Sequence, residues 1–207
     1  YPKVKRKKFV LSQAFYKPAL PFMFNMMFIM IPFGAVIAYS SIFAQEKGLS
    51  AVTPYFYVFL VAGMLLSKFS TQKMIDAGKH KVLVVVSLLI LLVTMGSYYF
   101  METAVHLLLA GFLLGLGYGI LQPLFQSFVT GTTPAEKRGT ANATYLLSYD
   151  IGIGIGSFVM GMFQDSIGLS TGFAITAAAY LIGGVIYAVY VDRYINTDLD
   201  LDLDSIG

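Results

Sequence analysis

The sequence lacks cysteine and contains few charged residues. None of its 207 residues is cysteine, so neither a disulfide bond nor a thiolate metal site contributes to its function. Only 12% of the residues are charged, against roughly 25% in a soluble domain, whereas 57% are hydrophobic. The mean hydropathy is +0.73. These values exclude a soluble globular domain and indicate an integral membrane protein.

Long apolar stretches predict six membrane-spanning helices. A bilayer core about 30 Å thick requires about 20 mostly apolar residues for each helical crossing. The stretches that meet this requirement are Phe22–Ala44, Pro54–Thr71, Val82–Phe100, Val105–Thr130, Thr140–Gln164 and Thr171–Val191. Because the connections are short, we expect consecutive helices to be antiparallel neighbours in one bundle.

The two ends of the chain have opposite charge. We expect a basic cytoplasmic segment over residues 1–21, the six-helix bundle over 22–193 and an acidic cytoplasmic tail over 194–207. The basic segment leads into a full-length span without a small-residue cleavage site, so it does not resemble a signal peptide. Since the chain starts at Tyr1 and not at Met, we expect it to be a piece of a longer protein, or a chain whose beginning is missing.

Basic residues predict the orientation in the membrane. Lys and Arg of short loops stay on the cytoplasmic side of a membrane protein. If the N-terminus lies inside, 13 of the 14 basic residues belong to inside segments, and Lys47 alone lies outside. We therefore expect a multi-pass protein of the cell membrane, plasma or inner, with both termini cytoplasmic.

One carboxylate, Asp150, lies deep in the fifth predicted span. It is about 15 Å from Thr140 along a helix, which is half of the hydrocarbon thickness. A charge at this depth costs about 2.5–3.5 kcal/mol and has to face protein or water, so intramembrane carboxylates are functional by default. We interpret Asp150 as a proton or cation site. A structural alternative is a carboxylate that only joins two helices by hydrogen bonds.

The helical period divides the fifth predicted span into two faces. At 100° per residue, small or polar residues such as Gly154 share the face of Asp150, whereas Gly152 and Gly156 lie on the opposite side. The spacing Gly-x-x-x-Gly is typical of close helix packing in membranes. We expect the first face to line a cavity and the two glycines to form a packing surface.

Polar residues in two other spans are candidate substrate contacts. In the fourth span Tyr118, Gln122 and Gln126 share one face, and in the first span Asn25 lies near the inside end. The amides are expected to line a substrate cavity or, alternatively, to bond neighbouring backbone. No pattern indicates a metal site, a cofactor, a nucleic-acid site or catalytic residues.

The order of these features resembles the C-terminal half of a major facilitator superfamily transporter. The resemblance rests on the six spans, the basic stretch at the front, the loop MIDAGKHK and the glycine-rich fifth span. The most specific match, TPAEKRGTANATYLLSYDIGIGIG, is similar to the junction between helices ten and eleven of the drug–proton antiporter branch. It implies an all-α membrane fold in which these spans are helices seven to twelve. The partner is then a second six-helix half, upstream in the same chain or supplied by another copy.

The resemblance also implies a function and a gate. It implies a secondary active transporter that exports a small amphipathic molecule, a drug or a metabolite, in exchange for protons by alternating access. Asp76, with Lys79 and Lys81, would form the inside gate. A proton-coupled or passive importer of sugars or other metabolites stays open as an alternative.

Two other classes of membrane protein fit the sequence less well. A six-helix channel would need a selectivity filter or a ring of charges, and neither is visible. An intramembrane aspartyl protease needs two carboxylates that share a proton, and no acid besides Asp150 lies deep in a predicted span. We therefore do not expect an enzyme.

Overall fold

The computed structural model describes residues 16–192, apart from the side chains of Ser70, Gln72, Lys73 and Asp76. The expected acidic tail and residues 1–15 of the expected basic segment lie outside this range. Within it, every regular element is a helix.

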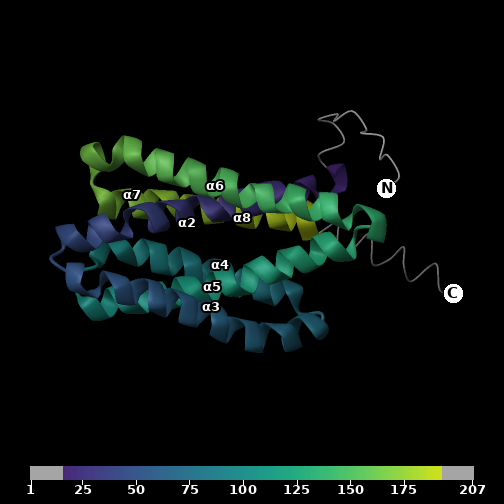
Figure 1. Cartoon of the computed structure of the whole chain (residues 1–207), viewed down its shortest axis with the longest axis horizontal. Helices are drawn as coiled ribbons and strands as arrows, with labels where there is room; N and C mark the ends of the chain where they lie inside the picture. The colour runs from purple at the N-terminus through teal and green to yellow at the C-terminus, as the bar shows by residue number, and fades with distance from the viewer. Residues whose placement is uncertain (1–15, 193–207) are drawn as a thin grey trace, which may run out of the picture.

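The described residues form six helical spans that run along the length of the molecule (Figure 1). They are α2 (Leu20–Glu46), α3 (Thr53–Asp76), α4 (His80–Ser97), α5 (Ala104–Gly131), α6 (Arg138–Ile167) and a last span composed of α7 (Leu169–Thr176), α8 (Ala178–Ile186) and the π-helical turn Tyr187–Val191. Short 3-10 turns occupy Lys17–Ala19, Ser50–Val52, Tyr98–Phe100 and Ala135–Lys137. Each span is long and apolar enough to cross a membrane, which confirms the six predicted spans.

The helices begin and end within a few residues of the predicted bounds, and two differences have a local cause. The first helix begins at Leu20, ahead of Phe22, because Pro21 suits the first helical turn, where a missing N–H costs no hydrogen bond. The last span is predicted as one continuous helix, but it is interrupted at Ala177, between α7 and α8. The apolar composition of a stretch predicts how long a membrane crossing is, but it does not predict whether the helix is continuous.

The two ends of the bundle differ in charge. Among the described side chains, Lys17, Lys79, Lys81, Lys137 and Arg138 lie at the end where α2 starts and where α5 is joined to α6. We call it the basic end, and it lies on the right in Figure 1. The far end carries Lys47, directly after α2.

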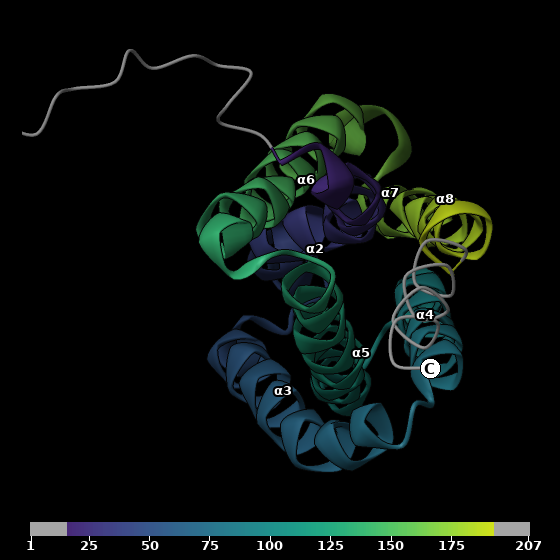
Figure 2. The same cartoon turned by 90° about the vertical axis from the view of Figure 1, so that its right-hand side faces the viewer.

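Two closely packed helix pairs build the bundle, α2 with α6 and α5 with α3 (Figure 2). The backbones of each pair approach where one helix has glycine. A Cβ on Gly156 of α6 would overlap the carbonyl oxygen of Ile31 in α2, and a Cβ on Gly115 of α5 would overlap that of Leu60 in α3. Small residues let membrane helices approach in this way, so their van der Waals contact holds the pairs together.

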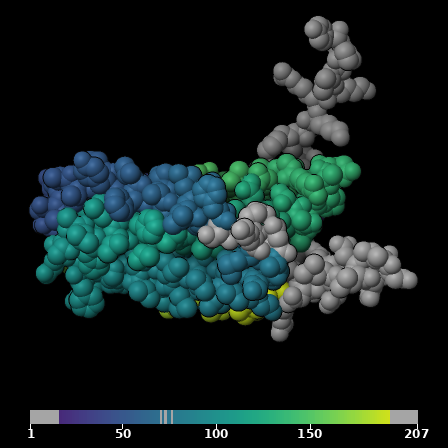
Figure 3. Space-filling view, turned by 90° about the horizontal axis from the view of Figure 1, so that it is seen from below, coloured from purple at the N-terminus to yellow at the C-terminus, as the bar shows by residue number. Residues whose placement is uncertain are grey.

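The helices are covered to different extents. In the spanning stretches of α2 and α5, 56% and 50% of the residues are buried, against 22% in those of α3 and α6. In the end view, α2 and α5 lie between α6 and α3, while α8 and α4 lie on the right (Figure 2). Figure 3 shows one long side of the molecule, formed by α3, α4 and part of α5. The helices α3 and α6 therefore keep broad uncovered surfaces.

Candidate functional site

Asp150 lies near the middle of α6, where its side chain is exposed. It follows Arg138, the first residue of α6, by about 18 Å along the helix axis. It has no hydrogen bond or ion pair with any described residue. Ala143, Leu146 and Gly154, which share its face, are exposed as well. Because a carboxylate at this depth is costly against lipid, this face requires a cover of protein or water.

Gly152 and Gly156 lie on the opposite side of α6, against α2. A Cβ on Gly152 would lie 2.5 Å from the carbonyl oxygen of Met27, and one on Gly156 would overlap that of Ile31. Both glycines are buried, whereas Gly154 between them has open space around it. The helix thus has one face in tight contact with α2 and one face, with Asp150, that no described helix covers.

Two tyrosines of α6 form a hydrogen-bonded chain next to Asp150. The Tyr145 hydroxyl donates to the backbone carbonyl of Gln122 in α5 at 3.1 Å. The hydroxyl oxygens of Tyr145 and Tyr149 are 2.9 Å apart. Since Tyr145 has already used its only proton, Tyr149 is the donor in this second bond. The Tyr149 oxygen can therefore still accept a hydrogen bond, but Tyr149 has no proton left to donate.

The contact between α5 and α6 continues toward the basic end with two amides. Gln126 Nε2 donates to Asn142 Oδ1 at 3.1 Å, and the Gln126 side chain is exposed. Asn142 precedes Asp150 by about 12 Å along α6. We call this set of residues the polar seam: Gln122, Gln126, Asn142, Tyr145, Tyr149 and Asp150. It runs from the basic end to mid-membrane depth.

Asn25 and Tyr118, two predicted substrate contacts, are fully buried among the six spans. Asn25 Nδ2 donates to the Gly183 carbonyl at 2.5 Å, across from α2 to α8. The Tyr118 hydroxyl pairs with that of Tyr180 in α8 at 2.5 Å and lies 3.5 Å from the Ile29 carbonyl in α2. Both side chains therefore bond neighbouring helices and face no open space in this conformation.

The predicted inside gate is only partly described. Lys79 and Lys81 are exposed at the basic end, where α4 begins, while the side chain of Asp76 lies outside the described residues. Lys81 forms an ion pair with Asp192, which follows the last span: Nζ lies 2.9 Å from Oδ2. Sequence reasoning did not select Asp192, because nothing in the sequence shows which helix ends are neighbours.

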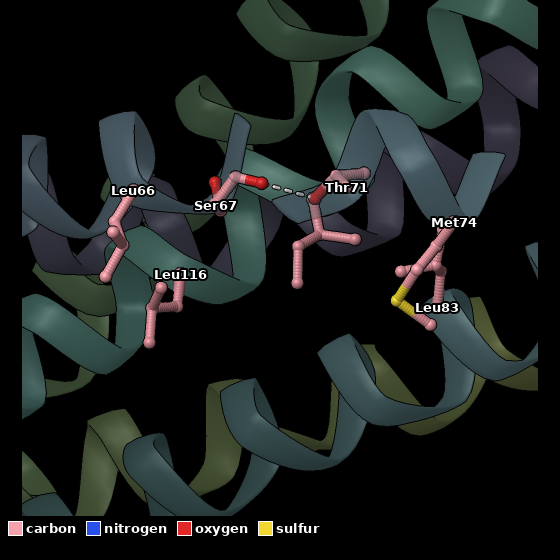
Figure 4. Close-up of a pocket in the computed structure, with 7 residues that line it drawn as sticks. Leu66, Ser67, Thr71, Met74, Leu83 and Leu116 are labelled. Atoms are coloured by element: carbon pink, nitrogen blue, oxygen red, sulfur yellow. Dashed lines mark hydrogen bonds between the residues drawn. The ribbon is translucent and has the colours of Figure 1, made fainter. Parts of the chain in front are cut away.

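A small cavity of about 150 Å³ lies between α3, α4 and α5, outside the polar seam (Figure 4). Its walls are apolar apart from two hydroxyl groups of α3. Ser67 donates to the Met64 carbonyl at 2.8 Å, and Thr71 donates to the Ser67 carbonyl at 2.6 Å. Both hydroxyl protons are used within α3, so this cavity offers no free donor to a ligand.

The polar seam contains residues that sequence reasoning did not single out, namely Asn142, Tyr145 and Tyr149. Tyr145 is buried on the same side of α6 as Gly152. The spacing of Tyr145 and Tyr149, one helical turn apart, is a signal that could have pointed to a direct contact. Their bond to α5 depends on how two helices pack, which the spacing within one helix does not reveal.

Six spans with a carboxylate on an uncovered mid-membrane face define a multi-pass helical membrane protein with a polar site at bilayer depth. The family model described as Major Facilitator Superfamily matches residues 2–157 and, in a second overlapping match, residues 65–198. The chain therefore belongs to the Major Facilitator Superfamily, a family of secondary transporters for small molecules. A comparison with curated proteins finds no match.

Proposed function

We propose that this chain is the C-terminal half of a proton-coupled exporter and that Asp150 binds the coupling proton or a cationic substrate. The observation that carries the proposal is the position of Asp150. Its carboxylate is exposed in the middle of α6 and has no partner among the described residues. In hydrocarbon such a group is tolerated only where protein or water covers it, and a cavity between two transporter halves supplies both.

The polar seam supports a substrate that donates hydrogen bonds. An ionised Asp150 only accepts hydrogen bonds, and the Tyr149 oxygen has only acceptor capacity left. A protonated amine has enough N–H donors for both acceptors, whereas a single hydroxyl group can donate to one of them. The surrounding surface, with Leu146 and the Tyr149 ring, is apolar. A small amphipathic molecule with a donor group matches this combination.

The uncovered helices support docking of a second half. The faces of α3 and α6 are the least buried of the six spans, and Asp150 lies on α6. A second six-helix half, from the same chain or from another copy, would cover these faces and close the cavity over Asp150. Gly152 and Gly156 would then let α6 rock against α2, because no side chain separates the two backbones at these positions.

The basic end supports a gate on the cytoplasmic side. We assign Asp76, Lys79 and Lys81 to this gate, and the ion pair of Lys81 with Asp192 ties α4 to the end of the last span there. Both termini would be cytoplasmic, as basic residues near membrane crossings favour. Breaking and forming such exposed ion pairs costs at most about 1 kcal/mol, which suits a gate that opens repeatedly.

Transport in proteoliposomes tests the proposal. The transporter is expressed from its natural gene, reconstituted, and given an imposed pH gradient and three labelled probes: doxorubicin, which is a cation through its protonated amine, chloramphenicol and lactose. We expect gradient-driven accumulation of the cationic probe, and a loss of at least tenfold in Asp150→Asn, which cannot release a proton. Asp165→Asn is the matched control, because Asp165 is an exposed carboxylate on the same helix near its far end. Accumulation by Asp150→Asn at the wild-type rate contradicts the proposal.

An importer uses the same fold and the same carboxylate, so direction needs its own measurement. Intact cells that express the transporter are incubated with each probe. An exporter lowers the cellular content of its substrate, and Asp150→Asn restores that content to the level of cells without the transporter. Accumulation of lactose above that level favours the importer.

A further inference from the structure

A groove runs along the surface between α4 and α8, on the side of the bundle to the right in Figure 2. Its volume is about 290 Å³ and its walls are almost entirely apolar. Val85 and Leu89 of α4 and Val185 of α8 border it, and each is more than half exposed. The groove lies on membrane-spanning helices, so its natural occupant is hydrocarbon.

Gly184 of α8 makes room in the groove. A Cβ at this position would lie 3.4 Å from Leu88 Cδ1 across the groove, which is an ordinary contact, whereas any longer side chain would fill the space. The neighbouring Gly183 points to the other side, where its nearest neighbours are Ile29 and Asn25 of α2. The two glycines therefore serve different contacts, and the groove can be filled without disturbing the packing against α2.

An ion pair stands at one end of the groove. Lys81 precedes Val85 by four residues on α4, and Asp192 follows Ala188 by four residues on the last span, so each lies about one helical turn beyond the lining residues. The Lys81 side chain is 63% exposed although it is paired with Asp192. A lysine ammonium has three donors, and one carboxylate oxygen uses one of them. Lys81 thus keeps donors for an additional anionic group at the basic end.

The groove lies at the depth that one lipid chain occupies in a leaflet. Its lining residues begin about 6 Å from the ion pair on both helices and end about 17 Å from it, at Leu92 of α4 and Tyr180 of α8. Half of a bilayer core is about 15 Å thick. With the ion pair at the membrane surface, the groove lies about 6–17 Å deep and ends near the bilayer midplane, where an acyl chain also ends.

We propose that this groove is a binding site for an anionic phospholipid. One acyl chain lies between α4 and α8, and the phosphate accepts hydrogen bonds from the Lys81 ammonium at the basic end. The apolar walls recognise the chain, and the lysine selects a headgroup with net negative charge. Asp192 holds the lysine over the mouth of the groove, and a lipid bound there bridges the same two helix ends as the ion pair.

Lipid retention on the purified transporter tests the proposal. Native mass spectrometry counts phosphatidylglycerol and phosphatidylcholine molecules of equal chain length that stay bound after mild detergent removal, and thermal unfolding measures the stabilisation by each lipid. We expect wild-type protein to prefer phosphatidylglycerol by about fivefold, the worth of one basic residue at an anionic surface. Gly184→Leu should lose one bound molecule of phosphatidylglycerol. Val185→Phe narrows the groove from the exposed side. This variant replaces Gly184→Leu in the experiment if Gly184→Leu does not fold.

Two substitutions separate the headgroup contact from the ion pair. Lys81→Gln and Asp192→Asn both break the pair, but only Lys81→Gln removes the cation that binds phosphate. We expect the ratio of retained phosphatidylglycerol to phosphatidylcholine to fall to about one in Lys81→Gln and to stay at the wild-type value in Asp192→Asn. Lys137→Gln, which removes a lysine from another part of the basic end, should leave it unchanged. Equal retention of both lipids by the wild type, or an unchanged preference in Lys81→Gln, overturns the proposal.

Discussion

The hydroxyl oxygens of Tyr145 and Tyr149 lie 2.9 Å apart on α6, and the carbonyl of Gln122 fixes the direction of the bond between them. Tyr145 gives its proton to that carbonyl, so Tyr149 gives its proton to Tyr145. This chain leaves an oxygen that can only accept a hydrogen bond on Tyr149, the residue before Asp150, in a part of the membrane where free acceptors are rare. The candidate site on α6 therefore combines a carboxylate with a chain of hydrogen bonds of fixed direction.

Tyr149→Phe should weaken substrate binding more than it weakens folding. The substitution removes one acceptor next to Asp150 and one hydrogen bond that is partly buried, which contributes about 1 kcal/mol to stability. We expect KM for a probe with a protonated amine, such as doxorubicin, to rise about tenfold, with kcat changed less. Tyr145→Phe removes the same bond but keeps the Tyr149 hydroxyl, so its KM should rise less. Equal KM values for both variants would argue against acceptance by Tyr149.

Gly156→Ala should destabilise the bundle, while Gly154→Ala should not. A Cβ at position 156 overlaps the Ile31 carbonyl of α2, whereas a Cβ at position 154 meets nothing within 4 Å. Overpacking costs about 1–3 kcal/mol, and alanine favours an exposed helix position by up to about 1 kcal/mol over glycine. Thermal unfolding of the two purified variants measures the difference. Equal stability of the two would show that α6 does not pack on α2 through Gly156.

Hydropathy and helical period predicted the crossings and the two sides of α6, because both properties are local. The apolar runs define the six spans, and the period separates the exposed face with Asp150 from the buried face with Gly152. Both signals depend on the order of residues within one helix.

These local signals do not predict which helices contact one another. Tyr118 shares a face with Gly111 and Gly115 of α5, yet these two glycines pack against α3, while the Tyr118 hydroxyl contacts α2 and α8. The face of a central helix is wide enough to touch several neighbours, so the period alone does not assign a partner. The pairing of Lys81 with Asp192, more than 100 residues apart in the chain, is unpredictable for the same reason.

Tyr180→Phe should lower stability and leave transport kinetics unchanged. The Tyr180 and Tyr118 hydroxyls form a buried pair at 2.5 Å, and Tyr118 keeps a longer contact of 3.5 Å with the Ile29 carbonyl. Loss of one buried hydrogen bond costs about 1 kcal/mol. We expect a lower unfolding temperature for both Tyr180→Phe and Tyr118→Phe, with KM as in the wild type. A raised KM in Tyr118→Phe alone would restore the substrate contact that the sequence predicts for Tyr118.

Single cysteines should report the orientation: the 207 residues contain none of their own, and any cysteine elsewhere in the transporter is replaced by serine first. Ser50→Cys places a thiol on an exposed turn at the far end, and Ala135→Cys places one on an exposed turn at the basic end. If the basic end is cytoplasmic, a membrane-impermeant maleimide added to intact cells should label Ser50→Cys and spare Ala135→Cys. After the cells are broken, both variants should react, which controls for the accessibility of each thiol. The reverse pattern in intact cells would place the basic end outside, and the gate assigned to Asp76, Lys79 and Lys81 would then face the exterior.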